Sequence, residues 1–558
     1  MWTIAALLIL CLKSFLHSEV PSEINKFQIT YLMQAREIEK ALDLYQKYKN
    51  NLKKNDFEVL EQIALILLEE GARSDDQEKQ LMSIFGSSVA SVSSSLDVLE
   101  AGIKSTHPET QVASIQFLGR MQDDRSDELL IKAMSSSFFF ARMEAAFQLA
   151  NRKHPSSVGQ IEALMYRIPP EFRFFFPQFF ALIGTSDAIS ILRQLMEDDL
   201  SSTRVEAILC AARSNRDDLL PIIRSSITHT NVAEQEACAF ALGVFKDSKS
   251  IPKLKKLLNS TSENVRLAAY KALFSLGDLS AKDAILEMVK NRNLFAISAA
   301  SAIPEAKEQL ALLCKDSVEA VRFNAAMSLL KLRDGRCLIP LLDIVIRDSR
   351  DLGFAPQVSL GKSHLAWKII PSATQQSKNG YDVSAISIQL REQLLKEALE
   401  LPERDFLLLA KMILDSRQNE LIPLVVSLLE NLQTPAALHL LKEKASISTN
   451  PLIRGYCNLA LFRLKKEGIY ERFLLDWIAQ NKNSDLIRFR PVVPIDKRLS
   501  DSPFELTPED NSRLLIESYQ ALADRHNETG INLLLDSLKE GNLKNRYVLA
   551  GLLLRALQ

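Results

Sequence analysis

The chain has 558 residues and a formal net charge of -1, with 68 Lys and Arg against 69 Asp and Glu. This balance supplies no overall attraction to polyanions, so we expect no nucleic acid among the partners. Only 17 residues are glycine, which is too few for many hairpin turns or phosphate-binding loops. The composition therefore predicts a protein that is almost entirely helical.

Residues 4–12 form an uninterrupted apolar run near the N-terminus. The run is too short to cross a bilayer and resembles the apolar core of a secretion signal. We expect residues 1–18 to be a signal peptide or an N-terminal membrane anchor, and the protein to be exported, periplasmic or membrane-anchored. If residues 4–12 form only a buried helix, the protein is cytoplasmic.

The six cysteines do not suggest a disulfide framework, because the five beyond Cys11 are an odd number spread along a long chain. Cys210, Cys238 and Cys457 fall inside apolar helical patterns, where cysteine behaves as a small hydrophobe. We expect buried free thiols.

Residues 22–106 keep the apolar spacing of helices but lack the repeat described next. The ends of repeat proteins are often atypical because one face has no neighbour. We interpret this segment as an N-terminal helical cap, with a separate small helical domain as the alternative.

Residues 107–347 contain a pattern that recurs every 31 residues. A long basic or amide side chain begins each copy, and small or apolar residues follow at helical spacing. These leading residues are Gln111, Arg142, Arg173, Arg204, Gln235 and Arg266, and the pattern returns at Arg322 and Arg454. We interpret Arg142, Arg173, Arg204, Arg266, Arg322 and Arg454 as a structural ladder that pairs with acidic or carbonyl groups of neighbouring units; a functional basic stripe is the alternative.

A second apolar run lies between successive copies, so each unit is predicted to be a pair of helices. Short acids stand at the end of one helix and the start of the next unit, where they are expected to bond free backbone amides. These residues are Asp123, Asp247, Asp278 and Asp334.

The segments around Val265-Arg266, Ala268-Ala269, Ala272-Leu273 and Leu276-Gly277-Asp278, with their copies from Val321 to Asp334, resemble the HEAT family. The likeness is to the short repeats of about thirty residues also found in phycobilin lyases. It implies an all-α fold, a right-handed alpha-alpha superhelix or HEAT-like solenoid. The shared residues serve stacking and do not imply an activity.

Two segments interrupt the repeats. Residues 348–384 are an irregular insertion rich in Gly, Pro and Ser, and residues 481–510 are a Pro-rich loop that carries Arg488 and Arg490. Each is either a contact for a partner or a passive connector. Residues 385–480 are expected to be helical repeats and residues 511–558 a C-terminal helical cap.

The densest aromatic run is the segment from Phe172 to Phe180. The repeat register assigns Phe175, Phe176, Phe179 and Phe180 to the core, and leaves Phe172 and Phe174 as candidate partner contacts on a patch with Phe138 to Phe140. The alternative is that all of these side chains are core. Pro177 is expected to kink a helix in its middle.

Recognisable catalytic and metal motifs are missing from the sequence. None of the seven histidines is followed by Glu, and the chain has no C-x-x-C, H-E-x-x-H or G-x-S-x-G pattern. We expect no enzyme activity, no cofactor, no metal and no catalytic residue.

The interpretation is a non-catalytic scaffold that holds a protein or peptide on a concave face formed by the second helices, exported or membrane-attached in a bacterium. Candidate contacts are Phe172, Phe174, Arg488 and Arg490. A lyase-like or chaperone-like protein that handles a prosthetic group is the alternative, and a nucleic-acid-binding HEAT protein is the second.

Overall fold

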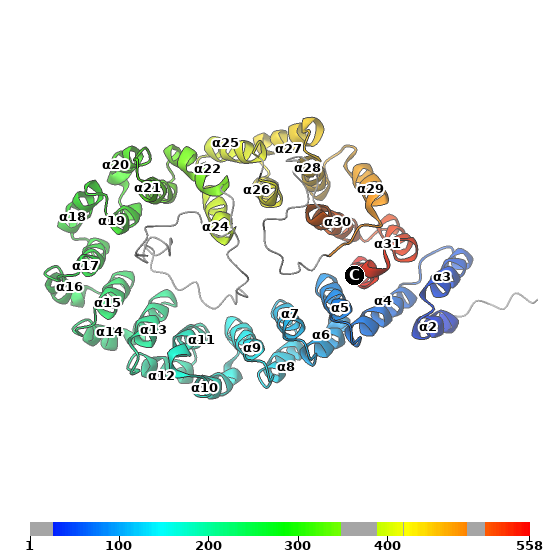
Figure 1. Ribbon diagram of the computed structural model, residues 1–558, viewed down its shortest axis with the longest axis horizontal. Coiled ribbons are helices and arrows are strands. Elements are labelled where there is room, and N and C mark those ends of the chain that lie inside the picture. The colour runs from blue at the N-terminus through cyan, green and yellow to red at the C-terminus, as the bar shows by residue number, and fades with distance from the viewer. Residues whose placement is uncertain (1–25, 347–387, 417, 488–507) are drawn as a thin grey trace, which may run out of the picture. The chain divides into compact units, whose positions relative to one another are not determined.

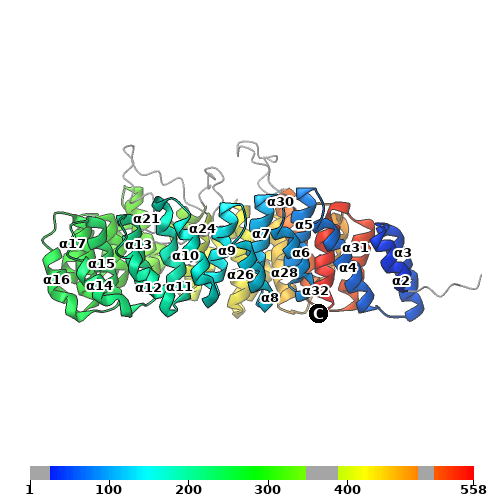
Figure 2. The same cartoon turned by 90° about the horizontal axis from the view of Figure 1, so that it is seen from below.

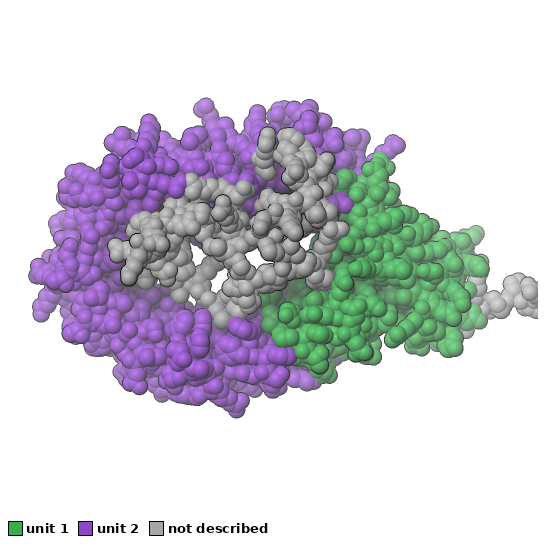
Figure 3. Space-filling model, viewed as in Figure 1, with its two compact units in different colours: residues 1–117, 476–489, 515–558 green, residues 118–475, 490–514 purple. Residues whose placement is uncertain are grey.

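The computed structural model describes residues 26–346, 388–416, 418–487 and 508–558. These residues form α-helices joined by short turns and 3₁₀ segments, and contain no strand (Figure 1). The chain divides into two compact units, coloured in Figure 3. Unit 1 comprises residues 1–117, 476–489 and 515–558, and unit 2 comprises residues 118–475 and 490–514.

Unit 2 begins with two rows of helices that stand roughly parallel in stacked layers (Figure 2). The row that carries the predicted ladder is α9 (Phe139–Asn151), α11 (Phe176–Ile183), α13 (Ser201–Arg213), α15 (Val232–Val244), α17 (Glu263–Ser275), α19 (Leu294–Ala299) and α21 (Glu319–Lys331). The other row is α8 (Asp124–Ala133), α10 (Val158–Tyr166), α12 (Ser186–Leu195), α14 (Leu220–Ser226), α16 (Ile251–Leu257), α18 (Leu279–Lys290) and α20 (Lys307–Leu313). Within unit 2 the ladder row lies on the inner side of a curve (Figure 1).

The assignment of the inner face to the second helices is therefore wrong. The reason lies in side-chain size, because the ladder row is rich in small residues and its helices approach closely. A Cβ atom added to Gly243 of α15 would lie 2.9 Å from the Cα of Ala272 in α17. A row that packs more closely than its partner row takes the shorter, inner side of a bend.

The solenoid continues beyond residue 387. Helix α22 (Leu338–Ile346) contacts both α24 (Ile388–Ala398) and α25 (Glu403–Leu414). The buried Arg391 of α24 donates to the carbonyl of Val345 at 3.3 Å and pairs with Glu420 at 2.7 Å. The following helices are α26 (Ile422–Leu432), α27 (Pro435–Ile447), α28 (Pro451–Arg463) and α29 (Tyr470–Asn481).

Short polar side chains start many helices, as the sequence predicts. Asp123, Asp278 and Asp334 each accept a hydrogen bond from a backbone amide two residues later, at 2.9 to 3.1 Å. Asp247 also stands at such a start, but its carboxylate receives the guanidinium of Arg224 in two bonds of 2.7 Å. These acids therefore fix helix starts and tie layers together.

The expected kink at Pro177 is wrong. Pro177 is the second residue of α11, and the segment before it, Pro170–Phe175, is the 3₁₀ helix η3. Proline is compatible with a first turn because the amide that it lacks would have no helical partner there. Phe175 thus belongs to η3 and is half-buried, whereas Phe176, Phe179 and Phe180 are fully buried as expected.

Unit 1 joins the two ends of the chain. Its helices are α2 (Lys26–Gln34), α3 (Ile38–Leu52), α4 (Phe57–Ala72), α5 (Gln77–Ala90), α6 (Leu96–Ile103), α31 (Glu528–Glu540) and α32 (Arg546–Ala556). Helices α7 (Pro108–Leu118), α29 and α30 (Pro508–Ala523) cross the boundary between the units. The two predicted caps, residues 22–106 and 511–558, thus lie mostly in one unit. Within it, α32 packs against α4 and α5.

The contact between α32 and α5 depends on glycine. A Cβ atom on Gly551 would lie 1.9 Å from the carbonyl oxygen of Gly86, and one on Gly86 would lie 2.4 Å from the carbonyl oxygen of Tyr547. Both obstacles are backbone atoms, so neither could move aside cheaply. The two helices therefore approach more closely than any larger residue would allow.

Polar bonds surround this contact. Arg555 donates to the carbonyl of Val89 at 3.1 Å, and Gln558 donates to the carbonyl of Ala90 at 3.2 Å. Both carbonyls belong to the last turn of α5, where four oxygens have no partner within the helix. The last residues of the chain thus bond free carbonyls at the end of α5, a helix from the N-terminal part of the sequence.

Candidate partner-binding surface

The predicted ladder has one recurrent geometry. Its members occupy the fourth position of a helix, as Arg142 does in α9, Arg204 in α13, Arg266 in α17, Arg322 in α21 and Arg454 in α28. Arg266 donates to the carbonyl six residues earlier at 2.7 Å and to the next carbonyl at 3.1 Å. Arg142, Arg204 and Arg322 make the same two bonds.

Glutamine performs the same task with one bond. The side-chain amides of Gln111 and Gln235 donate to the carbonyls six residues earlier, at 2.6 and 2.7 Å. These carbonyls lie in the turn that follows the preceding helix. At these six positions the column therefore satisfies backbone oxygens of a turn, which explains why it accepts either arginine or glutamine.

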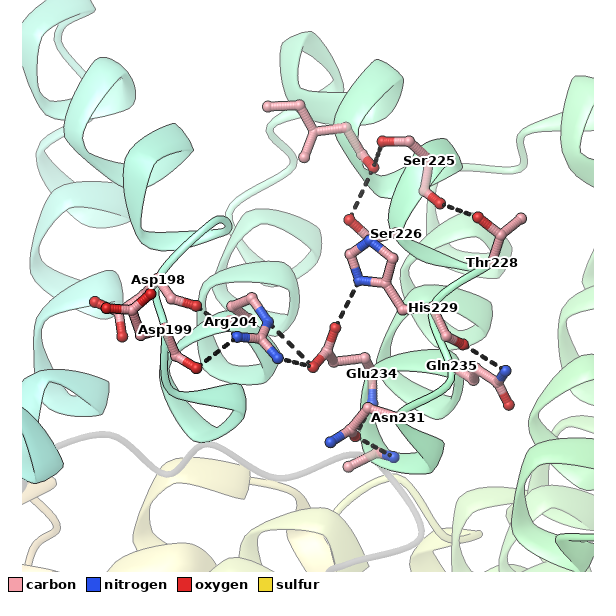
Figure 4. A network of polar contacts seen from close by, with 12 residues as sticks. Asp198, Asp199, Arg204, Ser225, Ser226, Thr228, His229, Asn231, Glu234 and Gln235 are labelled. Carbon is pink, nitrogen blue, oxygen red and sulfur yellow. Dashed lines mark hydrogen bonds and ion pairs between the residues drawn. The ribbon is translucent and has the colours of Figure 1, made fainter.

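Arg204 also connects two layers, in the network that Figure 4 shows. Arg204 of α13 donates to Glu234 of α15, with its Nε atom 3.1 Å from Oε1. The other oxygen of Glu234 lies 2.8 Å from Nδ1 of His229. Burial acts to raise the pKa of Glu234, but the bonds from Arg204 and His229 outweigh it and hold the pKa below the ordinary value.

Arg173 departs from this geometry. It is the fourth residue counted from Pro170, but that turn is the 3₁₀ helix η3. Its guanidinium lies 3.4 Å from Asp198 and 5.6 Å from the ring centre of Tyr166. Its buried Nε atom has no hydrogen-bond partner. At this layer the arginine therefore contacts side chains of α10 and of the turn after α12.

An aromatic surface surrounds η3, which we call the η3 surface and define as Tyr166, Phe172, Phe174 and Phe175. The side chains of Tyr166 and Phe172 are 59% and 44% exposed. The ring of Phe175 stacks on that of Phe172 with 6.5 Å between centroids, and lies 4.1 Å from that of Phe174. Aromatic side chains and arginine are enriched where proteins bind one another.

The sequence prediction identified only part of this surface. Of the two predicted contacts, Phe172 is exposed and Phe174 is half-buried, and the prediction did not include Tyr166. Phe140, in the layer before, is 50% exposed and packs edge-on to Phe139. Arg488 and Arg490 lie outside the described residues. Tyr166 ends α10, and its exposure could have been inferred from the two prolines that follow at 169 and 170.

The described cysteines are buried and free, as expected. Burial raises the pKa of the Cys314 thiol to about 11 and that of Cys337 to about 12. Thiols of this kind are poor nucleophiles and poor metal ligands at neutral pH. Within the described ranges, no cluster of three or more His, Cys, Asp or Glu is arranged to hold a metal ion.

No described helix combines the length and the apolar character needed to cross a membrane.

Comparison with known proteins supports the repeat fold. Residues 217–303 match the family model described as HEAT repeats. None of the curated proteins matches the sequence.

Several solved structures are similar to the chain at low identity. The complex of CpcE and CpcF of phycocyanin lyase from Nostoc sp. PCC7120 is 15% identical, with 49% of this chain and 88% of that chain covered and a TM-score of 0.18. UNC-45 from Drosophila melanogaster is 14% identical over 97% of this chain and 83% of its own, with a TM-score of 0.32. The karyopherin Kap121p, bound to the extreme C-terminus of Cdc14p, is 11% identical over 92% and 56%, with a TM-score of 0.29.

Scores of this size carry no argument about activity or partner. The fold is instead established by the geometry of the layers and by the family match. The helix pairs stacked in layers make the described part of the chain an all-α helical solenoid, and residues 217–303 within it match HEAT repeats.

Proposed function

We propose that the chain is a non-catalytic scaffold that binds a protein or peptide at the η3 surface. The observation that carries this proposal is the break in the repeat at residues 166–175. In the layers of Arg142, Arg204, Arg266 and Arg322, the leading arginine satisfies turn carbonyls of its own layer. At η3 the arginine is diverted and aromatic rings are exposed instead.

A break of this kind costs stability. A 3₁₀ turn has poorer hydrogen-bond geometry than an α-turn, and exposed aromatic rings lose the free energy of burial. Violations of the local rules of a fold occur mainly where function requires them. Exposed aromatic rings held by mutual stacking lose little side-chain entropy on binding, which favours a contact surface.

The test is affinity capture with the full chain from its native host. Phe172→Ser combined with Tyr166→Ser should abolish recovery of a polypeptide that the unchanged chain retains. A matched control is Leu279→Ser, because Leu279 is 68% exposed and lies on the outer helix α18. Equal recovery with both variants would refute the η3 surface as the contact.

The purified chain also distinguishes the scaffold from the alternatives. A bound chromophore or prosthetic group, seen by absorbance and mass spectrometry, would favour the lyase-like or chaperone-like reading. Recovery of nucleic acid would favour the hypothesis of a nucleic-acid-binding HEAT protein. We further propose, on sequence alone, that residues 1–18 direct export or attach the chain to a membrane, which cell fractionation and sequencing of the mature N-terminus would test.

A further inference from the structure

A local excess of positive charge lies at the C-terminal half of α3. Residues 44–55 contain four lysines, Lys47, Lys49, Lys53 and Lys54, and no Asp or Glu. The whole chain, in contrast, has a net charge of -1. Lys47, Lys53 and Lys54 are exposed, while Lys49 is half-buried. The segment is therefore locally basic on a nearly neutral protein, and Glu528 of α31 contacts it by accepting a hydrogen bond from the side-chain amide of Asn55 at 2.6 Å.

The nearest acids in sequence are engaged elsewhere. Asp56 accepts the hydroxyl of Tyr48 at 2.9 Å, and Glu58 pairs with Lys26 at 2.9 Å. Earlier on α3, Asp43 pairs with Lys539 at 2.6 Å and Glu39 with Arg546 at 3.2 Å. Among the described residues, no ion pair involves Lys47, Lys53 or Lys54, so their charge is available to a partner.

Exposed apolar side chains flank these lysines. Leu52 ends α3 and is 41% exposed, and Phe57 begins α4 and is 51% exposed. We call the short segment of Leu52, Lys53, Lys54 and Phe57, at the junction of α3 and α4, the basic-apolar surface.

We propose that the basic-apolar surface binds an anionic lipid bilayer. Lysines next to exposed aromatic and aliphatic side chains match such a surface, because the ammonium groups approach acidic headgroups while the apolar groups enter the interface. The surface also lies close in sequence to the apolar run of residues 4–12, since α2 begins at Lys26.

The apolar run of residues 4–12 and the basic-apolar surface would each give a weak membrane attachment, and the two would act together. As a helix, nine residues would extend about 14 Å, roughly half of the ~30 Å hydrocarbon core, so the run alone cannot span a bilayer. Stable attachment of a peripheral protein usually needs a second signal. The inference therefore extends the attachment proposed above from the N-terminal segment to the folded unit.

The experiment is sedimentation of the full chain with phosphatidylcholine vesicles that contain or lack phosphatidylglycerol. We expect binding to the anionic vesicles only, and release at high salt. Lys53→Glu combined with Lys54→Glu should lower the partition coefficient by about 30-fold or more, from the contribution expected of each lysine near an acidic surface. Leu52→Ser combined with Phe57→Ser should lower it by about tenfold.

The matched control is Lys255→Glu combined with Lys256→Glu, two exposed lysines of α16, which should leave vesicle binding unchanged. Thermal melts of all variants confirm that each folds. A chain that starts at Ser18 should still bind in a salt-sensitive way, which separates this surface from the N-terminal segment. Equal binding to neutral and anionic vesicles would overturn the proposal, as would unchanged vesicle binding by the Lys53 and Lys54 variant. It would also be overturned if these two lysines affected binding only to a protein partner.

Discussion

Units 1 and 2 are both made of helix pairs, but the contacts within each unit join residues at different separations along the sequence. In unit 2, Arg204 and Glu234 are 30 residues apart, and Arg224 and Asp247 are 23 apart. In unit 1, the bond between Arg555 and Val89 joins residues 466 apart, and that between Arg546 and Glu39 joins residues 507 apart. Unit 2 thus resembles a one-dimensional stack, whereas unit 1 contains segments from both ends of the chain.

The largest effect should follow from removing α32, by ending the chain after Glu540. The buried faces of α4 and α5 would lose their partner, so their amide hydrogens should exchange at rates near those of an unfolded chain. Amides of α13 to α17 should stay protected. Hydrogen exchange read by mass spectrometry makes the comparison, and continued protection of α4 and α5 would show that unit 1 does not depend on the chain end.

A single methyl group should have the next largest effect. Gly551→Ala places a Cβ atom against the backbone of Gly86, so unit 1 should lose about 3 kcal/mol of stability as the helices separate. Chemical denaturation monitored by exchange within each unit measures the loss. The control is Gly159→Ala in α10, where an added Cβ meets nothing within 4 Å. An equal response to both changes would contradict the close contact.

The ladder of unit 2 gives a smaller, graded effect. Arg266→Ala removes two bonds to turn carbonyls and should cost about 2 kcal/mol. Arg266→Gln should cost less, because Gln235 makes one such bond at 2.7 Å in the neighbouring layer. Equilibrium denaturation compares the two. If Arg266→Gln lowers the free energy of unfolding as much as Arg266→Ala, bonds to turn carbonyls do not explain why arginine or glutamine recurs at this position.

The smallest effect is a dependence on pH. The pKa of Glu234 is below the ordinary value of 4.5 when folded, so the unfolded chain binds this proton more tightly. The contribution of Glu234 to stability is complete above about pH 4.5 and falls as pH drops through the folded pKa. Between pH 3 and 7, the melting temperature of Glu234→Gln should therefore change less with pH than that of the unchanged chain. An equal change in both proteins would show that the ion pair of Glu234 does not contribute to stability.

The sequence predicted local features well and distant contacts poorly. The 31-residue column predicted equivalent helices led by Arg142, Arg204 and Arg266, and the structure places each at the fourth position of its helix because each layer repeats the same backbone need. The pairing of Gly86 with Gly551 leaves no periodic trace, since it occurs once and joins distant segments. The inner row was misassigned because apolar spacing shows which faces are buried, whereas curvature depends on how closely the rows pack.

The candidate surface was predicted in part for the same reason. Phe172 and Phe174 were found because they exceed what the repeat requires. Tyr166 was missed because it ends an otherwise regular helix, and its relation to Arg173 is three-dimensional.

The joining of both chain ends in unit 1 has a consequence for biosynthesis. Helix α5 ends at Ala90, but α32 begins only at Arg546. At typical rates of about 5 to 20 residues per second, the ribosome needs roughly 20 to 90 s to cover that interval. During this time the faces of α4 and α5 that later receive α32 remain open, which gives chaperones a defined period to act on the nascent chain.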